Sequence, residues 1–329
     1  MKYIDLFAGI GGFRLGIERA FDNRRVAKTP ELEKENSTDI KRSNGNGGWT
    51  NTDCVYTNEW DKYAAQIYEK NFGGTVDTRD ITTIDASELP DFDILCGGFP
   101  CQAFSVAGNR AGFNDTRGTL FFDIARICKV KRPRYLLLEN VKGLLSHDNG
   151  KTFQTILGVL TDLGYDCQWQ VFNSKNFGVP QNRERVFIVG HLRGQRRPQV
   201  FPIEGDNQKA VVGPVTASAG RNRSTGSNYV AEMGTYRTYR DGAGFRKMKS
   251  KLSPTLPARA RNDGTGSPLL FNGIWIRRLT PIECARLQGF PDNWCEGLSD
   301  TQAYKCYGNA VTVNVVQAIM ERLSKYHND

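Results

Sequence analysis

One cysteine of this 329-residue chain stands where a thiol can do chemistry. Cys101 follows an apolar run, stands beside Pro100 and precedes a loop, residues 102–118, that contains glycines and arginines. A thiol between a strand and a glycine-bearing loop is typically exposed and reactive. The chain has 8 cysteines without a C-x-x-C pair and 3 histidines. We therefore expect the other thiols to be buried in a reducing compartment, with no metal site.

A glycine-rich turn near the start predicts a cofactor site. An apolar run at residues 2–7 is followed by Ala8-Gly9-Ile10-Gly11-Gly12 and a helical stretch to Phe21. Strand, glycine turn and helix open a nucleotide-binding sheet, because glycines let the backbone approach a ligand. The G-x-G-G spacing differs from the dinucleotide fingerprint G-x-G-x-x-G. This difference weakens a nicotinamide oxidoreductase hypothesis without removing it.

The sequence after this turn contains four residues that could hold a nucleoside. Glu59 follows a predicted strand at residues 54–58, and a carboxylate there can accept both hydroxyl protons of a ribose. Trp60 is expected either to stack on adenine or to be an ordinary core aromatic. Asp80 and Ile81, which we place at the end of the next strand region, are expected to offer adenine a polar and an apolar contact.

Further motifs follow in a recognisable order. They are Asp5–Gly12, Pro100-Cys101-Gln102, Glu139-Asn140-Val141, Gln181–Arg185, Arg278–Pro291 and Gly308–Val311. In type and order they resemble the signature motifs of the DNA (cytosine-5)-methyltransferases. The resemblance covers nearly the whole chain and is closest to bacterial type II restriction–modification methyltransferases of the HhaI type.

The resemblance implies methyl transfer from S-adenosylmethionine to C5 of a cytosine flipped out of double-stranded DNA. Cytosine C5 is a weak nucleophile, and thiolate addition at C6 activates it as an enamine. The resemblance assigns this addition to Cys101. It assigns Glu139 to N3 and the exocyclic amine, and Arg185 to O2. Arg183 is expected to support the cysteine loop or the DNA backbone. No side chain is assigned to remove the C5 proton, so water is expected to remove it.

The resemblance also implies a cofactor pocket and a set of DNA contacts. The expected cofactor residues are Phe7, Gly9, Ile10, Gly12, Glu59, Trp60, Asp80, Ile81, Gly98, Pro100, Leu120, Asn309 and Val311. The expected DNA contacts are Gln102, Ser105, Arg117, Arg240, Thr255, Arg259 and Arg261. The loop at residues 102–118 is expected to close over the flipped base and exclude water.

Strands that alternate with helices must position these residues. Apolar runs at residues 2–7, 54–58, 93–96, 135–139, 168–172 and 185–189 predict strands. Helical periodicity marks residues 153–163 and a closing helix with apolar positions from Val311 to Leu323. The alternation predicts an α/β fold, and the resemblance makes it a Rossmann-like S-adenosylmethionine-dependent methyltransferase sheet with helices on both faces.

Charge marks a second unit. Residues 191–275 hold 14 basic and 5 acidic side chains and so carry the whole net charge of +9. We expect a small loop-rich DNA-recognition domain with its hinge at 191–308, and a catalytic domain at 1–190 plus 309–329. The polar residues 22–52 predict a surface insertion. Clustered positive charge favours a nucleic-acid partner over a solvated basic face.

Three alternatives remain at this stage. An RNA cytosine-5 methyltransferase would use the same chemistry. A nicotinamide oxidoreductase leaves the Pro-Cys-Gln motif unexplained, and a catalytically silent DNA-binding protein is disfavoured by intact Cys101, Glu139 and Arg185. Without a long apolar run or a signal peptide, we expect a cytoplasmic, nucleoid-associated prokaryotic monomer. A cognate restriction endonuclease that forms no stable complex with it is a further expected partner.

Cys101→Ser is expected to abolish methyl transfer, because a hydroxyl adds to C6 far less readily than a thiolate. DNA binding should stay largely intact, since the substitution changes one atom. Transfer of tritiated methyl groups to DNA and a gel-shift titration measure the two properties. Retained turnover would show that Cys101 is not the nucleophile.

Overall fold

The computed structural model describes residues 1–26, 52–100, 120–195, 198–205, 232–239, 242–247, 252–257, 268–271 and 276–325. The predicted nucleophile and several predicted DNA contacts lie outside these ranges: Cys101, Gln102, Ser105, Arg117, Arg240, Arg259 and Arg261. Residues 27–51 of the predicted insertion also lie outside them.

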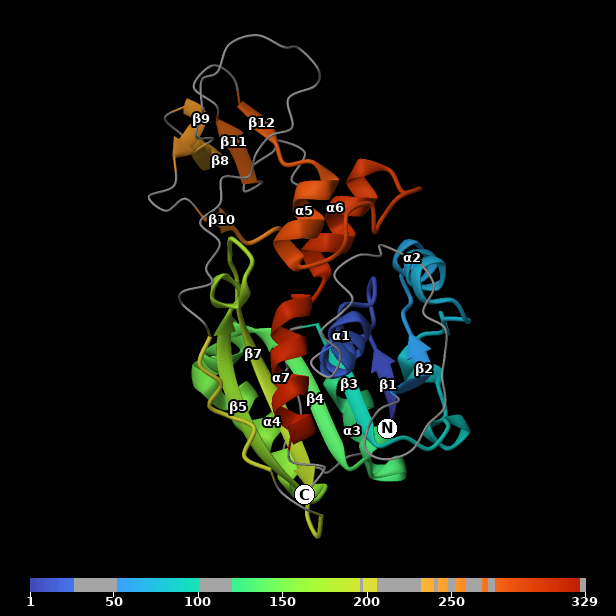
Figure 1. Ribbon diagram of the computed structural model, residues 1–329. Helices are drawn as coiled ribbons and strands as arrows, with labels where there is room; N and C mark the ends of the chain where they lie inside the picture. Colours follow the sequence, from blue (N-terminus) through green and yellow to red (C-terminus); the bar gives the residue numbers. More distant parts are fainter. Residues whose placement is uncertain are drawn as a thin grey trace.

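A six-stranded sheet forms the centre of the molecule (Figure 1). Its order is β2 (Asp53–Asn58), β1 (Lys2–Leu6), β3 (Ile94–Gly98), β4 (Tyr135–Val141), β7 (Glu184–Leu192) and β5 (Tyr165–Asn173). The pairs among β2, β1, β3 and β4 are parallel, whereas β7 is antiparallel to both β4 and β5. The structure therefore contains a strand at each of the six predicted runs.

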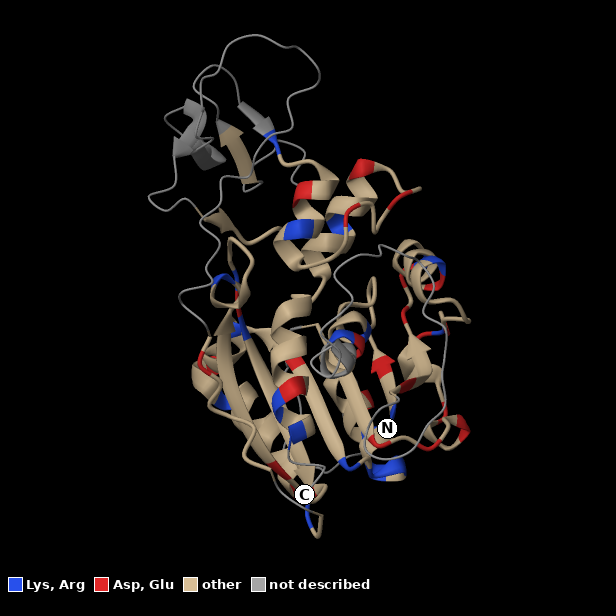
Figure 2. Ribbon diagram, viewed as in Figure 1, with Lys and Arg blue, Asp and Glu red and all other residues tan. Residues whose placement is uncertain are grey.

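Helices cover both faces of this sheet, as predicted (Figure 1). On one face lie α1 (Gly12–Val26) and α7 (Val313–Lys325), and on the other α3 (Phe121–Lys131) and α4 (Lys151–Asp162). Successive strand residues point to opposite faces, so Tyr3 packs with α1 and α7 while Ile4 packs with α3 and α4. Figure 2 shows that the strands carry few charged residues. Most charged residues lie on the helices and on the connections between elements.

A smaller antiparallel sheet lies beyond the carboxyl ends of the parallel strands (Figure 1). Its order is β12 (Ile276–Arg278), β11 (Pro268–Phe271), β8 (Glu232–Tyr239) and β9 (Gly242–Lys247). Between the two sheets lie α5 (Pro281–Gln288) and α6 (Asp300–Asn309), and β6 (Gln181–Asn182) pairs with β10 (Ser253–Pro254). A loop-rich second unit was expected here, and it contains this sheet.

The chain remains on the large sheet beyond residue 190. Strand β7 continues to Leu192, and the Gln168 and Gln170 side chains of β5 hydrogen-bond the backbone of residues 198–203. Val200 and Phe201 join the apolar cluster beneath α7. The division into domains at residues 190 and 309 stays a prediction.

Two local predictions were wrong. Helix α1 runs to Val26 and not to Phe21, so the first five residues of the predicted insertion are helical. Asp80 does not end a strand: it begins the 3-10 turn η1 (Ile81–Thr83), where its Oδ1 accepts the Thr82 N–H at 3.0 Å. A side chain that bonds its own backbone competes with strand pairing.

The remaining described elements are short or lie at the edge. They are α2 (Lys62–Phe72), η2 (Ala86–Glu88), η3 (Lys142–Leu145), η4 (His147–Gly150) and η5 (Ser174–Phe177). None of the helices in the described ranges has the length and apolar character needed to cross a membrane. The seven cysteines in these ranges are free thiols, and five of them are buried.

Helices α1 and α7 cross at Gly16, which predicts a stability effect. A Cβ at Gly16 would lie 2.7 Å from Cβ of Val316 and 2.9 Å from the Val313 carbonyl oxygen. Gly16→Ala should therefore lower the free energy of unfolding by about 1–3 kcal/mol through overpacking. Gly158→Ala in α4 is the control, because a Cβ there meets nothing within 4 Å. Urea unfolding should find it neutral or stabilising; equal losses in both variants would contradict the crossing argument.

Candidate active site

The predicted site residues gather at one edge of the large sheet. The chain passes from β1 to β2 on one side and then returns to β3 on the other, so the strand order reverses between β1 and β3. Ligands of such sheets bind at the carboxyl ends of the strands beside this reversal. Phe7 and Gly9 follow β1, Glu59 follows β2, and Gly98 ends β3. The topology thus brings residues from three separate motifs to one place.

Two of the predicted catalytic side chains meet on neighbouring strands. The β4–β7 register pairs Val141 with Arg185 and Glu139 with Phe187. Glu139 and Arg185 are therefore diagonal neighbours on the same face of the sheet. Nε of Arg185 lies 3.1 Å from Oε1 of Glu139, and their side chains are only 16% and 12% exposed. This buried ion pair is the centre of the candidate site.

Burial sets the electrostatics of this pair. It raises the pKa of Glu139 above its usual value, while Arg185 and Arg183 act in the opposite direction. Within the described ranges no donor hydrogen-bonds Oε1 of Glu139. A Cβ on Gly98 would lie 3.3 Å from Oε2, so a glycine there leaves room for the carboxyl group. Oε1 of Glu139 is therefore a buried acceptor whose neighbour is the Arg185 charge.

Arg183 is buried, which argues against the DNA backbone as its partner, while its expected support of the cysteine loop stays a prediction because residues 101–119 lie outside the described ranges. Its side chain is 2% exposed, and Nη2 donates to the carbonyls of Ala310 at 2.8 Å and Gly308 at 3.3 Å. Burial and the neighbouring Arg185 lower its pKa. A guanidinium enclosed in this way does not face a DNA backbone. It ties the Gln181–Arg185 motif to the Gly308–Val311 motif, which lies far away in the sequence.

Asn140 is a site residue that the sequence reasoning missed. Its Nδ2 donates to the Phe99 carbonyl at 2.9 Å, and its Oδ1 accepts the Val141 N–H at 2.8 Å. The side chain is 2% exposed and lies on the face of β4 opposite to Glu139. It therefore holds the backbone immediately before Pro100. Two polar residues, Glu139 and Asn140, directly after four apolar strand residues were the available signal.

Three predicted cofactor residues line the ends of β1 and β2. Both carboxylate oxygens of Glu59 accept backbone N–H groups at 2.8 Å, Oε2 from Gly9 and Oε1 from Asp61. Gly9 has a φ of +55°, and nothing lies within 4 Å of the position of a Cβ there. Trp60 is 75% exposed, which excludes the core-aromatic alternative. Open backbone, a carboxylate and an exposed indole suit a nucleoside.

Other predicted cofactor residues lie deeper. Ile10 and Ile81 are 0% and 3% exposed and belong to apolar clusters. They therefore support the carboxyl edge of the sheet from inside the core. A Cβ at Gly12 would lie 2.6 Å from Cγ1 of Val311, which is why these two positions pack together. The remaining predicted positions are nearer the surface: Phe7 and Leu120 are half-buried, and Pro100 and Asn309 are exposed.

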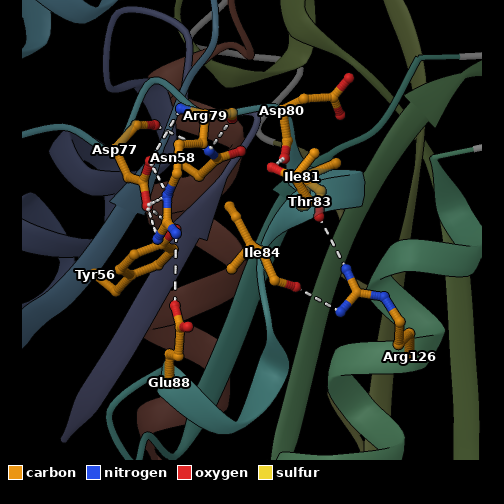
Figure 3. A network of polar contacts seen from close by, with 10 residues as sticks. All are labelled: Tyr56, Asn58, Asp77, Arg79, Asp80, Ile81, Thr83, Ile84, Glu88 and Arg126. Atoms are coloured by element: carbon orange, nitrogen blue, oxygen red, sulfur yellow. Dashed lines mark hydrogen bonds and ion pairs between the residues drawn. The ribbon is translucent and has the colours of Figure 1, made fainter.

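A network of polar contacts fixes the segment that carries Asp80 (Figure 3). The Asn58 side chain, at the end of β2, donates to the carbonyls of Asp77 and Arg79 at 2.9 Å. Arg126 of α3 donates to the carbonyls of Ile84 at 2.7 Å and Ile81 at 2.9 Å. The segment is thus anchored to α3 and to β2, with which it forms only an isolated parallel bridge between Asp77 and Asn58.

Thr255 is the predicted DNA contact that the structure describes. Its hydroxyl donates to the Asn182 carbonyl at 3.0 Å, next to the short β6–β10 pairing of Gln181 with Ser253. Thr255 therefore lies where the basic segment meets the strand that leads to Arg183 and Arg185.

This arrangement is that of a Rossmann-like α/β enzyme with its site at the carboxyl edge of the sheet. The family model of the C-5 cytosine-specific DNA methylases matches residues 1–325. The type II methyltransferase M.NlaX of Neisseria lactamica is 42% identical over 338 residues, which cover 98% of this chain and 96% of the relative. M.HhaI of Haemophilus parahaemolyticus is 36% identical over 336 residues, which cover 97% of this chain and 93% of the relative.

A solved structure shares the fold. The Dnmt2 methyltransferase of S. pombe superposes with a TM-score of 0.65 over 100% of both chains, at 19% identity. The chain belongs to the C-5 cytosine-specific DNA methylase family. Family membership confirms the predicted fold and the predicted DNA (cytosine-5)-methyltransferase activity. The RNA and oxidoreductase alternatives are set aside.

Asn140→Ala should lower kcat about 10-fold, because loss of a buried hydrogen bond of about 1–1.5 kcal/mol frees the Phe99 carbonyl beneath the Pro100 segment. Asn71→Ala is the control, since the Asn71 amide likewise bonds the backbone, donating to the carbonyls of Ile67 and Trp294 away from this segment. Steady-state methylation and urea unfolding should separate the variants: both lose stability, and only Asn140→Ala loses kcat. An equal effect on kcat would reduce Asn140 to a general structural role.

Proposed function

We propose that this enzyme transfers a methyl group from S-adenosylmethionine to C5 of a specific cytosine in double-stranded DNA, with Cys101 as nucleophile. The observation that supports it most directly is the Glu139–Arg185 ion pair at the carboxyl edge of the sheet. A buried carboxyl with a raised pKa, beside a guanidinium, suits a neutral ring that gains negative charge during the reaction.

The proposed cofactor site lies at the ends of β1 and β2. Glu59 would hold the ribose hydroxyls, Trp60 would stack on the adenine, and the open backbone at Gly9 would pass close to the ligand. Asp80, Gly98, Asn309 and the other predicted positions would complete the pocket. When bound, S-adenosylmethionine supplies an electrophilic methyl group on its sulfonium.

The protein's own residues would activate the base. The Cys101 thiolate adds to C6, and the electron pair of the C5–C6 bond becomes available at C5. Glu139, protonated, donates to N3 and accepts from the exocyclic amine, while Arg185 donates to O2. After methyl transfer, loss of the C5 proton to water re-forms the double bond and expels the Cys101 thiolate. Each group acts on a ring already out of the duplex.

Access to the ring requires base flipping, because C5 and C6 are enclosed within the stacked duplex. We assign closure over the flipped cytosine to residues 102–118, with Gln102, Ser105 and Arg117 toward the DNA. Sequence recognition is assigned to the basic residues 191–275, where arginines can hold phosphates or read guanine edges. Arg240, Thr255, Arg259 and Arg261 are the proposed contacts.

The biological setting follows from the relatives. M.NlaX and M.HhaI are named type II methyltransferases, so we propose that this enzyme is the modification partner of a restriction–modification system. A cognate endonuclease would read the same site without a stable complex, and the methyltransferase would act as a monomer. We further propose that it acts on the nucleoid, in the cytoplasm of a bacterial cell.

The proposal is tested by trapping the covalent step. On DNA that carries 5-fluorocytosine at the target, in the presence of S-adenosylmethionine, C5 would hold fluorine and methyl after the transfer. It would then have no proton to lose, so the wild-type enzyme should stay covalently attached. Glu139→Gln should cut the trapping rate by about 10²- to 10⁴-fold, since it removes the proton donor. Glu321→Gln on α7 is the matched control and should trap normally. Trapping at an unchanged rate by Glu139→Gln would refute the assigned role of Glu139.

A further inference from the structure

We propose that Lys305 is a positioning residue for the methyl donor, because its ion pair with Asp61 joins the two sides of the proposed cofactor site. One side is the turn between β2 and α2, which carries Glu59 and Trp60. The other is the end of α6, which carries Asn309. The inference rests on the proposed S-adenosylmethionine site and names a residue that none of the sequence motifs singled out.

The contact itself is close and well oriented. Nζ of Lys305 lies 2.5 Å from Oδ2 of Asp61, whose side chain is 21% exposed. The other oxygen of Asp61 caps α2 by accepting the N–H groups of Tyr63 at 3.0 Å and Ala64 at 3.2 Å. The carboxylate is therefore held in place by its own helix, and only the lysine loses freedom when the pair forms.

Asp61 connects this pair to the predicted ribose ligand. Its backbone N–H donates to Oε1 of Glu59, and the other oxygen of Glu59 accepts the N–H of Gly9. A continuous chain of contacts thus runs from Lys305 through Asp61 and Glu59 to Gly9. It joins α6, the β2–α2 turn and the glycine turn after β1.

The charge of Lys305 acts on Glu59 as well. Burial raises the pKa of Glu59, whereas hydrogen bonds from the backbone N–H groups of Asp61 and Gly9 lower it. The negative charge of the Asp61 side chain raises this pKa, and the positive charge of Lys305 lowers it. Without Lys305 the two neighbouring carboxylates would lose this opposing charge. Glu59 can accept two ribose hydroxyl protons only when it is ionised, so Lys305 favours the binding form.

Lys305 also positions the opposite side. It precedes Asn309 by four residues on α6, and residues four apart lie on the same face of a helix. Figure 2 shows charged residues of both signs on α2 and α6, the two elements that this pair joins. The pair therefore sets the position of the Asn309 end of α6 relative to Glu59 and Trp60.

A second ion pair across the same junction supplies a matched control. Lys70 of α2 lies 3.2 Å from Glu296, which precedes α6. It joins the same parts of the chain with the same charges. None of the contacts that the structure shows for Lys70 lead to Glu59.

The experiment compares Lys305→Met, Asp61→Asn and Lys70→Met in the full-length enzyme. Lys305→Met should raise the KM for S-adenosylmethionine and the Kd for S-adenosylhomocysteine about 3- to 5-fold, the range of a partly exposed ion pair. Its kcat and DNA affinity should stay within about 2-fold, as should every constant of Lys70→Met. Asp61→Asn removes the charge but keeps a side chain that can cap α2. Because both substitutions break the same ion pair, the double variant should bind the cofactor no more weakly than the weaker of the two single variants.

Several outcomes would overturn the inference. Equal increases in KM for Lys305→Met and Lys70→Met would indicate a general role at the junction. A fall in kcat at unchanged KM would place Lys305 in the chemical step. Lys305→Arg, which keeps the charge, should restore cofactor affinity, and thermal unfolding checks that each variant folds. If wild-type enzyme does not bind S-adenosylhomocysteine by calorimetry, the proposed cofactor site fails instead.

Discussion

The Glu139–Arg185 ion pair is the interaction on which the site depends. The two side chains are only 12% and 16% exposed, and their mutual attraction offsets part of the desolvation of each charge. That geometry comes from β7, which enters the sheet antiparallel to β4 and places Arg185 diagonally opposite Glu139. With a parallel neighbour in place of β7, the two side chains would not share this register. The reversed strand is therefore as important to the proposed chemistry as either charged residue.

The covered sheet explains why polar chemistry is confined to one edge. Helices bury both faces of the central strands, so these strands are largely apolar, as Tyr135–Leu138 of β4 is, although Asp5 of β1 is a fully buried carboxyl. Polar residues appear where the strands emerge from this cover. At the end of β4, Glu139 and Asn140 point to opposite faces of the sheet and make different contacts. Glu139 meets Arg185, whereas Asn140 bonds the Phe99 carbonyl and so holds the backbone that leads to Pro100.

Several contacts join distant parts of the chain around this edge. Arg183 bonds the carbonyls of Gly308 and Ala310, Lys305 pairs with Asp61, and Trp294 donates to the Ile10 carbonyl at 2.9 Å. Each connects the C-terminal helices to a segment much earlier in the sequence. The residues after the basic segment therefore complete the catalytic edge as well as closing the chain. This explains why a motif near the end of the sequence belongs with the motifs near its beginning.

The sequence by itself determined the class of fold, the six strands and the class of enzyme, and it predicted the residues of the site. Alternating apolar runs and ordered motifs depend on local residue types, which a sequence displays directly. The tertiary structure decided which partners those residues have. The burial of Arg183, the exposure of Trp60 and the anchoring role of Asn140 depend on strand register and helix packing, which bring together residues far apart in the chain. Asp80 shows the same limit, because it was placed at the end of a strand region, whereas its side chain bonds the neighbouring backbone and begins a turn.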